Sequence, residues 1–250
     1  MTQKRGCAPV AVVLVAGIGE RLHPLTLHRP KALVQVGGES MLARSVRLLL
    51  AHGVEQIVLA TGFKEDAVRE AMQGVPVPVS YQLNPRYRET QNAVSLLACE
   101  QAVAGRAFYK LDGDLLFRAE VLERLDEVDS GLVVAMDRSV ELGQEEMKIR
   151  LKQGGTSIAA FGKGLEPSSC HGESIGIERV NEVAVSLIFH GLRQAVEAGE
   201  THLYYEDVYG RLVDHGLEAR GVDVGDLSWI EVDTAGDLSR AEAMVRAGLL

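Results

Sequence analysis

The stretch LVAGIGERLHPLTLHRPKAL, residues Leu14 to Leu33, decides the fold of this 250-residue chain. It continues from Val10–Val15, an unbroken apolar, mostly β-branched run that is typical of a strand buried on both faces of a parallel sheet. Glycines in the segment Ala16–Gly19 end the strand, and glycine lets backbone N–H groups approach phosphate oxygens closely. These features predict a strand followed by a phosphate-binding loop.

The same loop gathers positive charge. Arg21, Arg29 and Lys31 supply three formal cations, and Pro24 and Pro30 disfavour one continuous helix. A solvated charged loop is the ordinary alternative, but the combination of glycines, prolines and cations after a buried strand favours a polyphosphate site. The spacing fits neither a dinucleotide-binding glycine motif nor a Walker loop.

Strand-like and helix-like segments alternate through the first half of the chain. This alternation predicts an α/β fold with a Rossmann-like, mostly parallel central sheet flanked by helices. We expect the first half to hold strands at 56–60, 77–83 and 107–111 and helices at 41–50, 64–72 and 92–104. Short strands at 147–151, 157–161 and 174–177 predict a small antiparallel β addition, before helices at 182–198 and 205–215, a strand at 229–232 and a helix at 234–246.

The composition of the chain limits the kinds of partner that it is expected to bind. The net charge of −9 and a pI near 5.3 argue against nucleic acid, because a phosphate backbone usually selects a basic surface. The three cysteines are widely spaced, which indicates neither a disulfide framework nor a zinc site and fits a reducing cytoplasm. The opening apolar run is too short for a signal or membrane segment, so we expect a cytoplasmic protein without a membrane partner.

At this point the loop resembles the signature of the nucleotidyltransferases that make nucleoside diphosphate sugars and related activated alcohols. The matching positions are Ala16, Gly17, Gly19, Arg21, Pro24, Leu25, Thr26, Pro30 and Lys31. The likeness continues at NPRYRETQNAVSL (84–96), at Asp112-Gly113-Asp114 and at WIEVD (229–233), and it departs at Val15, where the family more often has alanine. It is strongest to the short choline-phosphate cytidylyltransferase-like branch, which shares the wording of residues 30–34 and the pattern Asn92, Ser95, Leu96.

The resemblance implies transfer of a nucleoside monophosphate, CMP being favoured, from a nucleoside triphosphate to a small phosphorylated or phosphonylated alcohol, with release of pyrophosphate. It implies catalytic roles for Arg21, at the β and γ phosphates, and for Lys31, beside the α or the acceptor phosphate. It also implies Mg²⁺ held by Asp114 and Asp233. Asp112 and Glu231 are second choices as metal ligands. The ordinary alternative is a β-turn for Asp112-Gly113-Asp114 and a position beside a helix N-terminus for Asp233.

Further site residues follow from the same resemblance. The nucleotide would contact Ala16, Gly17, Gly19, Gly62, Gln82, Asn92, Ser95 and Asp112, although Asn92 and Ser95 also suit the start of a helix. The acceptor would contact Lys148, Glu173, Tyr205 and Asp207. Lys148 replaces an aromatic residue of the choline branch, so it favours an acceptor phosphate, phosphonate or carboxylate over choline. The cluster at residues 204–207 suits an ammonium or sugar hydroxyls, or simply starts a helix.

The resemblance implies one nucleotidyltransferase domain over residues 1–250. Its parts would be a nucleotide-binding core at about 8–137, acceptor-side strands at about 146–180 and a return to the core at 181–250. Two other functions stay open: a sugar-1-phosphate transferase using UTP, dTTP or GTP, and a non-catalytic nucleotide-sensing relative. Retention of both cations and both aspartates disfavours the second. Many relatives self-associate, which leaves a homo-oligomer open.

Overall fold

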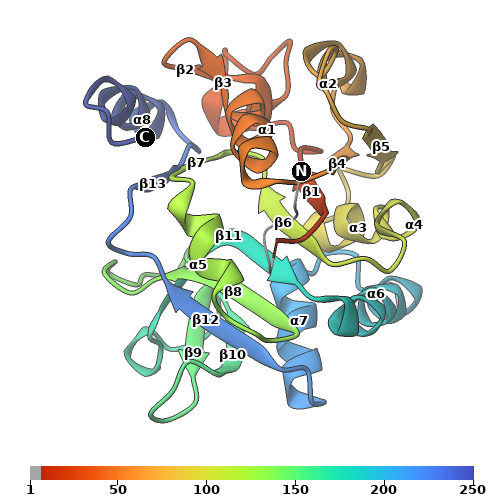
Figure 1. Cartoon of the computed structure of the whole chain (residues 1–250), viewed down its shortest axis with the longest axis vertical. Coiled ribbons are helices and arrows are strands. Elements are labelled where there is room, and N and C mark those ends of the chain that lie inside the picture. Colours follow the sequence, from red (N-terminus) through yellow and green to blue (C-terminus); the bar gives the residue numbers. More distant parts are fainter. Residues whose placement is uncertain (1–6) are drawn as a thin grey trace.

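The computed structural model describes residues 7–250, and strand β1 (Val10–Leu14) lies at the centre of its main sheet (Figure 1). β1 pairs in parallel with β4 (Gln56–Thr61) on one side and with β6 (Phe108–Asp112) on the other. β5 (Val79–Leu83) continues the parallel part beyond β4. The carboxyl ends of these strands therefore meet at one edge of the sheet.

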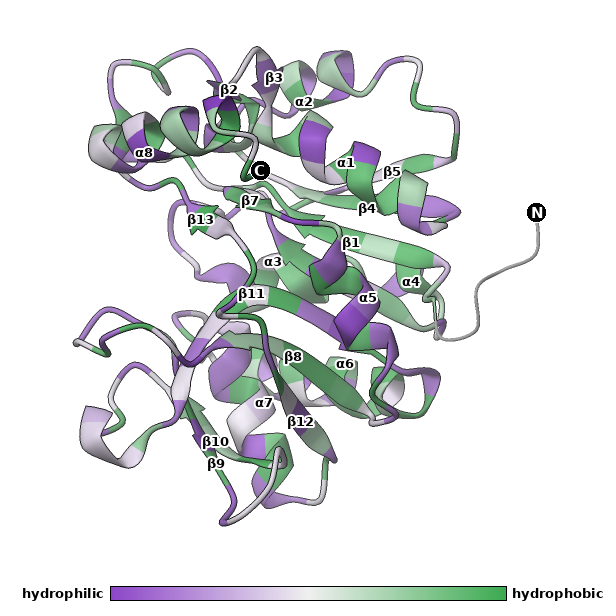
Figure 2. Ribbon diagram, turned by 60° about the vertical axis from the view of Figure 1, so that its left-hand side comes forward, coloured by the Kyte–Doolittle hydropathy of each residue, from purple (hydrophilic) through white to green (hydrophobic). Residues whose placement is uncertain are grey.

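Helices cover both faces of this sheet. One face carries α3 (Asn92–Leu97), α4 (Glu100–Val103), α6 (Glu182–Glu197) and α7 (Tyr205–Asp214), and the other carries α1 (Met41–His52), α2 (Glu65–Ala71) and α5 (Glu120–Asp126). Val10 and Val12 pack into the first core, whereas Ala11 and Val13 pack into the second. Because β1 has no solvent-facing side, every position favours an apolar residue. Figure 2 shows the resulting hydrophobic colouring along β1, β4 and β8 (Leu132–Asp137).

The second half of the chain extends the same sheet. β11 (Gly172–Val180) runs antiparallel to β6 and also pairs with β8 and with β9 (Lys148–Leu151), and β9 pairs in turn with β10 (Ile158–Gly162). β12 (Ala219–Asp223) lies parallel to β8. The predicted fold class, a mostly parallel central sheet flanked by helices with a smaller antiparallel part, is confirmed.

Two small sheets complete the described chain. β2 (Gln35–Val36) pairs with β3 (Glu39–Ser40), and β7 (Leu115–Phe117) pairs antiparallel with β13 (Trp229–Glu231). The second pair joins the segment after β6 to the segment before α8 (Ala235–Arg246). Thr234 and Asp237 form the predicted capping box of α8, since each side chain accepts a hydrogen bond from the backbone N–H of the other.

One predicted helix is interrupted. The segment expected as a single helix over 92–104 forms α3 and α4, with a break near Cys99. The N–H of Cys99 donates to the carbonyl of Leu96, and its Sγ lies 3.5 Å from the carbonyl oxygen of Ser95, the ordinary helical acceptor. This tighter turn ends the first helix. The sequence pattern also did not single out β2, β3, β7, α5, β8 and β12.

Across residues 7–250, no helix combines the length and the apolar character needed to cross a membrane.

Candidate active site

A cavity of about 640 Å³ opens at the carboxyl ends of β1 and β6. Ala16 and Gly17 line it directly after β1, and Asp112, Gly113 and Asp114 line it directly after β6. Ligands of open α/β sheets bind beyond the carboxyl ends of the strands, so the cavity lies where this fold places a binding site.

The two loops that form the cavity floor touch each other at Gly113. A Cβ atom on Gly113 would lie 2.6 Å from the carbonyl oxygen of Leu14 and 2.7 Å from Cγ1 of Val15. The N–H of Gly113 also donates to that carbonyl at 3.0 Å. Glycine is therefore required at this position for the close approach of the two loops.

The cationic loop is folded back on itself through Gly19. Gly19 has φ near 74°, and its carbonyl oxygen accepts a hydrogen bond of 2.7 Å from Oγ1 of Thr26. A Cβ atom there would lie 2.7 Å from Cβ of Lys31. Gly19 does not line the cavity, so its role in this structure is to let Lys31 approach the glycine turn.

Lys31 bridges the two predicted metal ligands. Its Nζ lies 2.5 Å from Oδ2 of Asp114 and donates a second hydrogen bond to Oδ1 of Asp233. Burial opposes the charge on this lysine, but the two carboxylates outweigh burial and raise the pKa of Lys31. Arg21 forms an ion pair with Asp233 at 2.5 Å, and its side chain is 67% exposed against 12% for Lys31. Lys31 is thus the interior cation and Arg21 the surface cation.

Three carboxylates could hold a divalent cation here. Ligand oxygens of Asp114, Glu231 and Asp233 lie within 4.8 Å of one another. The pairing of β7 with β13 brings them together, because the N–H of Val232 donates to the carbonyl of Asp114 at 3.0 Å. Oδ1 of Asp114 is buried and receives no hydrogen bond from any described residue. An all-oxygen donor set with one unpartnered buried oxygen fits Mg²⁺.

On the predicted nucleotide side, Asn92 and Ser95 line the cavity. Oδ1 of Asn92 accepts a hydrogen bond from the N–H of Tyr205, so Asn92 also joins α3 to the start of α7. Gly62 and Gln82 do not line the cavity. Gly62 lies behind it, since a Cβ atom there would lie 2.8 Å from the carbonyl of Ala16 and from the Tyr87 side chain.

Lys148 does not lie at the predicted acceptor site. Its side chain is fully buried, and Nζ donates to the backbone carbonyls of Gly143, at 2.8 Å, and Glu146, at 3.2 Å. It therefore braces a loop and does not line the cavity, which corrects the predicted acceptor contact. Glu173, its cross-strand partner in β11, does line the cavity, and burial together with Glu146 and Asp137 raises the pKa of Glu173 to about 7.

The cluster at the start of α7 divides between structural and cavity roles. Oδ2 of Asp207 accepts a hydrogen bond of 2.9 Å from the N–H of Tyr204, so Asp207 caps the helix and does not line the cavity. Tyr205 is fully buried and its hydroxyl donates to Oδ2 of Asp112 at 3.0 Å. It positions Asp112 from behind. Tyr204 and Glu206, on either side, line the cavity instead.

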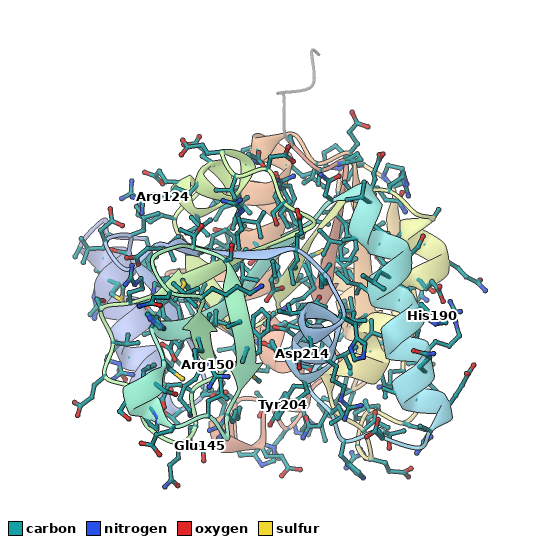
Figure 3. All side chains as sticks on the ribbon, turned by 90° about the horizontal axis from the view of Figure 1, so that it is seen from below. Arg124, Glu145, Arg150, His190, Tyr204 and Asp214 are labelled. Atoms are coloured by element: carbon teal, nitrogen blue, oxygen red, sulfur yellow. The ribbon has the colours of Figure 1, made fainter. Side chains whose placement is uncertain are left out.

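Several cavity residues had no individual role in the predicted site. They are Tyr87, Glu145, Glu146, Lys163, Tyr204, Glu206, Trp229 and Arg240. Figure 3 shows Glu145 and Tyr204 toward the same side of the molecule. Tyr204 and Glu206 belong to the predicted cluster at 204–207, and Tyr87 and Trp229 lie in the segments 84–96 and 229–233 that carry the resemblance. Lys163 lies in a Gly-Lys-Gly segment that does not fit the Walker pattern and carries no other signal.

Comparisons with known proteins agree with this geometry. The chain is 28% identical over 249 residues to CMP-5'-(3-aminopropyl)phosphonate synthase of Streptomyces rubellomurinus, covering 93% of this chain and 38% of that protein. It is 30% identical over 236 residues to the bifunctional IPC transferase and DIPP synthase of Rubrobacter xylanophilus, covering 94% of this chain and 51% of that protein. The chain thus spans about half or less of the length of these relatives.

The fold is also that of the inositol-1-phosphate CTP transferase from T. maritima. The two structures superpose with a TM-score of 0.82 at 21% identity, over 99% of this chain and 100% of the other. The MobA-like NTP transferase domain model matches residues 11–160. This region includes the cationic loop, the two loops that form the cavity floor, and Asp114. The resemblance drawn from the loop is confirmed, and the chain belongs to the MobA-like NTP transferase family.

Proposed function

We propose that this chain transfers CMP from CTP to a small phosphorylated or phosphonylated alcohol and releases pyrophosphate, with Mg²⁺ as cofactor. The observation that carries the proposal is the pairing of Lys31 and Arg21, which do not line the cavity themselves, with Asp114 and Asp233, which do. These residues come from three distant segments. Cations that stabilise phosphates and carboxylates that hold a metal are the two groups that phosphoryl chemistry needs.

The proposed reaction needs no protein nucleophile, because the acceptor phosphate or phosphonate oxygen attacks the α-phosphorus directly. The protein would mainly position the two substrates and stabilise the charge that develops on the leaving pyrophosphate. Arg21, whose side chain is exposed, would bind the terminal phosphates through its planar guanidinium. Lys31, which lies against Gly19, would bind near the reacting phosphate.

Asp114, Asp233 and Glu231 would hold Mg²⁺ when the nucleotide binds. The ion would polarise phosphate oxygens and offset their charge. Lys31 already contacts Oδ2 of Asp114, whereas Oδ1 of the same carboxylate is buried and receives no hydrogen bond from the described residues. Asp114 can therefore support the lysine and the ion through different oxygens.

The preference for CTP rests on the relatives. The alignment with a protein named for making a CMP-phosphonate covers 93% of this chain. The alignment is longer than the region 11–160 that the family model matches, so the similarity is not confined to the nucleotide-binding half of the chain.

The first test is thermal denaturation with Mg²⁺ and each of CTP, UTP, GTP, ATP and dTTP in turn. A ligand that binds only the folded state raises the melting temperature, and CTP should raise it most. Pyrophosphate release with CTP and an acceptor should then be lost in Asp114→Asn, which keeps the size of the side chain but removes its charge. Selective stabilisation by another nucleotide, or full turnover in Asp114→Asn, would contradict the proposal.

A further inference from the structure

One wall of the cavity is acidic. Glu145, Glu146, Glu173 and Glu206 all line it, and they come from a loop, from β11 and from α7. The cations in the cavity lining are Lys163 and Arg240, and Arg240 is paired with Asp237. An acidic surface by itself is only a solvated face, but one member of this wall, Glu206, is buried.

Glu206 is a buried carboxylate with an unused oxygen. The residue is 5% exposed, and its Oε2 is buried without a hydrogen bond from any described residue, although the side chain lines the cavity. A buried carboxylate oxygen without a donor is unfavourable unless a ligand supplies the donor. A ligand group with an N–H or O–H, bound beside Glu206 in the cavity, would supply this donor.

Lys110, a buried lysine near Glu206, already contacts other acceptors. Nζ of Lys110 lies 2.9 Å from Glu178, 3.3 Å from Asp112 and 3.2 Å from the carbonyl of Gly176. It also lies 3.6 Å from the centre of the Tyr205 ring. Three carboxyl groups, those of Asp112, Glu178 and Glu206, therefore share one lysine. A positively charged ligand group beside them would favour the ionised form of Glu206.

The structure favours a primary over a quaternary ammonium. A trimethylammonium has no N–H and is usually bound by several aromatic faces. The aromatic residues that line the cavity are Tyr87, Tyr204 and Trp229. Nζ of Lys163 already lies 4.8 Å from the centre of the Tyr204 ring, and the indole N–H of Trp229 donates to Asp137 at 2.8 Å. A group with N–H donors satisfies Glu206, whereas a methylated one does not.

We propose that the acceptor is an aminoalkyl phosphate or phosphonate, whose primary ammonium is bound by Glu206 with Glu173 nearby. This inference rests on the proposed function, because it identifies the acceptor of the same reaction. Lys163 provides a cation for the anionic end of such a molecule, and among the described residues it forms no ion pair. The acceptor is therefore a zwitterion, with its amine at the acidic wall and its phosphate or phosphonate toward the nucleotide.

The test compares three probes with the wild-type protein, CTP and Mg²⁺: 3-aminopropylphosphonate, n-propylphosphonate and choline phosphate. We expect kcat/KM for pyrophosphate release to be at least about tenfold higher with 3-aminopropylphosphonate than with either other probe. Equal values for the amino and the propyl compounds would overturn the inference. So would a preference for choline phosphate.

Glu206→Gln is the matched variant, with Glu197→Gln, an exposed residue of α6, as its control. Glu206→Gln should raise KM for 3-aminopropylphosphonate at least about tenfold while leaving KM for CTP unchanged, and Glu197→Gln should change neither. An unchanged acceptor KM in folded Glu206→Gln would overturn the assignment. If that variant does not fold, the three probes still decide the question with the wild-type protein.

Failure of this inference can be told apart from failure of the proposed function. If CTP stabilises the protein and inositol 1-phosphate is turned over in preference to 3-aminopropylphosphonate, the amine assignment is overturned and cytidylyl transfer stands. If CTP neither binds nor supports turnover with any probe, the proposed function itself is overturned, and the amine assignment falls with it.

Discussion

Lys31 and Arg21 contribute different things to the site, although both are cations of one loop. Lys31 lies between two carboxylates and is 12% exposed, so removing its charge leaves Asp114 and Asp233 facing each other. Arg21 forms one ion pair at the surface. Exposed pairs of this kind contribute about 0–1 kcal/mol to stability.

We therefore expect Lys31→Met to lower both stability and rate, and Arg21→Ala to lower the rate alone. The loss of kcat/KM should be roughly 100-fold or more in each case, because each residue binds charge that develops in the reaction. Urea denaturation and pyrophosphate release measure the two effects. A Lys31→Met protein with wild-type turnover would remove this residue from the mechanism.

The sequence could predict Lys31, Asp114 and Asp233 because their position depends on local features. Lys31 follows a proline, Asp114 follows a glycine after the parallel strand β6, and Asp233 follows the end of β13, which pairs antiparallel with β7. Lys148 could not be predicted in the same way. Its residue type suggests an anion contact, but the carbonyls of the Gly143–Glu146 loop determine where its ammonium points. That loop has no sequence pattern that fixes its path.

At the scale of elements, the close contact of the loops after β1 and β6 depends on Gly113. In Gly113→Ala the new Cβ would meet backbone and Val15 at under 3.0 Å, so one loop must move. We expect a loss of about 1–3 kcal/mol in the free energy of unfolding, as in other overpacked sites, together with weaker Mg²⁺-dependent activity. Gly164→Ala is the control, because nothing lies within 4 Å of the place its new methyl group would take. Equal melting temperatures for the two variants would contradict the predicted crowding.

Helices and strands could be predicted where one hydrophobic pattern runs through the whole segment, but not where tertiary contacts determine the local structure. The apolar run of β1 and the capping box of α8 are local signals, and both are confirmed. The helix breaks near Cys99, where the N–H of Cys99 donates to the carbonyl of Leu96, three residues back. Glu206 lies in a predicted helix start, but its burial depends on β6, β11 and α7 packing together, which no local pattern describes.

At the scale of the whole molecule, the site concentrates carboxylates that are costly to ionise. Burial, with Asp112 and Glu178 adding to it, raises the pKa of Glu206 to about 8, and Lys110 opposes the shift only in part. Groups on three elements face Glu206: Lys110 and Asp112 of β6, Glu178 of β11, and Tyr205 and Tyr209 of α7. Such a group lowers stability when it loses its proton, and groups of this kind are retained where function needs them.

This arrangement fixes the sign of a pH effect. An unfolded glutamate loses its proton near pH 4.5, whereas the raised pKa keeps Glu206 protonated in the folded state until about pH 8. Between these values the folded state binds more protons, so Glu206 lowers stability as the pH rises from about 5 to about 8. Glu206→Gln should therefore gain stability over the wild type by an amount that grows from about pH 5 to about pH 8, on the order of 1–3 kcal/mol.

Urea denaturation of both proteins at about pH 5, 6.5 and 8 measures this difference. A difference that is constant or shrinks with pH would show that Glu206 is ionised throughout, whereas growth that 3-aminopropylphosphonate reduces would tie the buried charge to the acceptor.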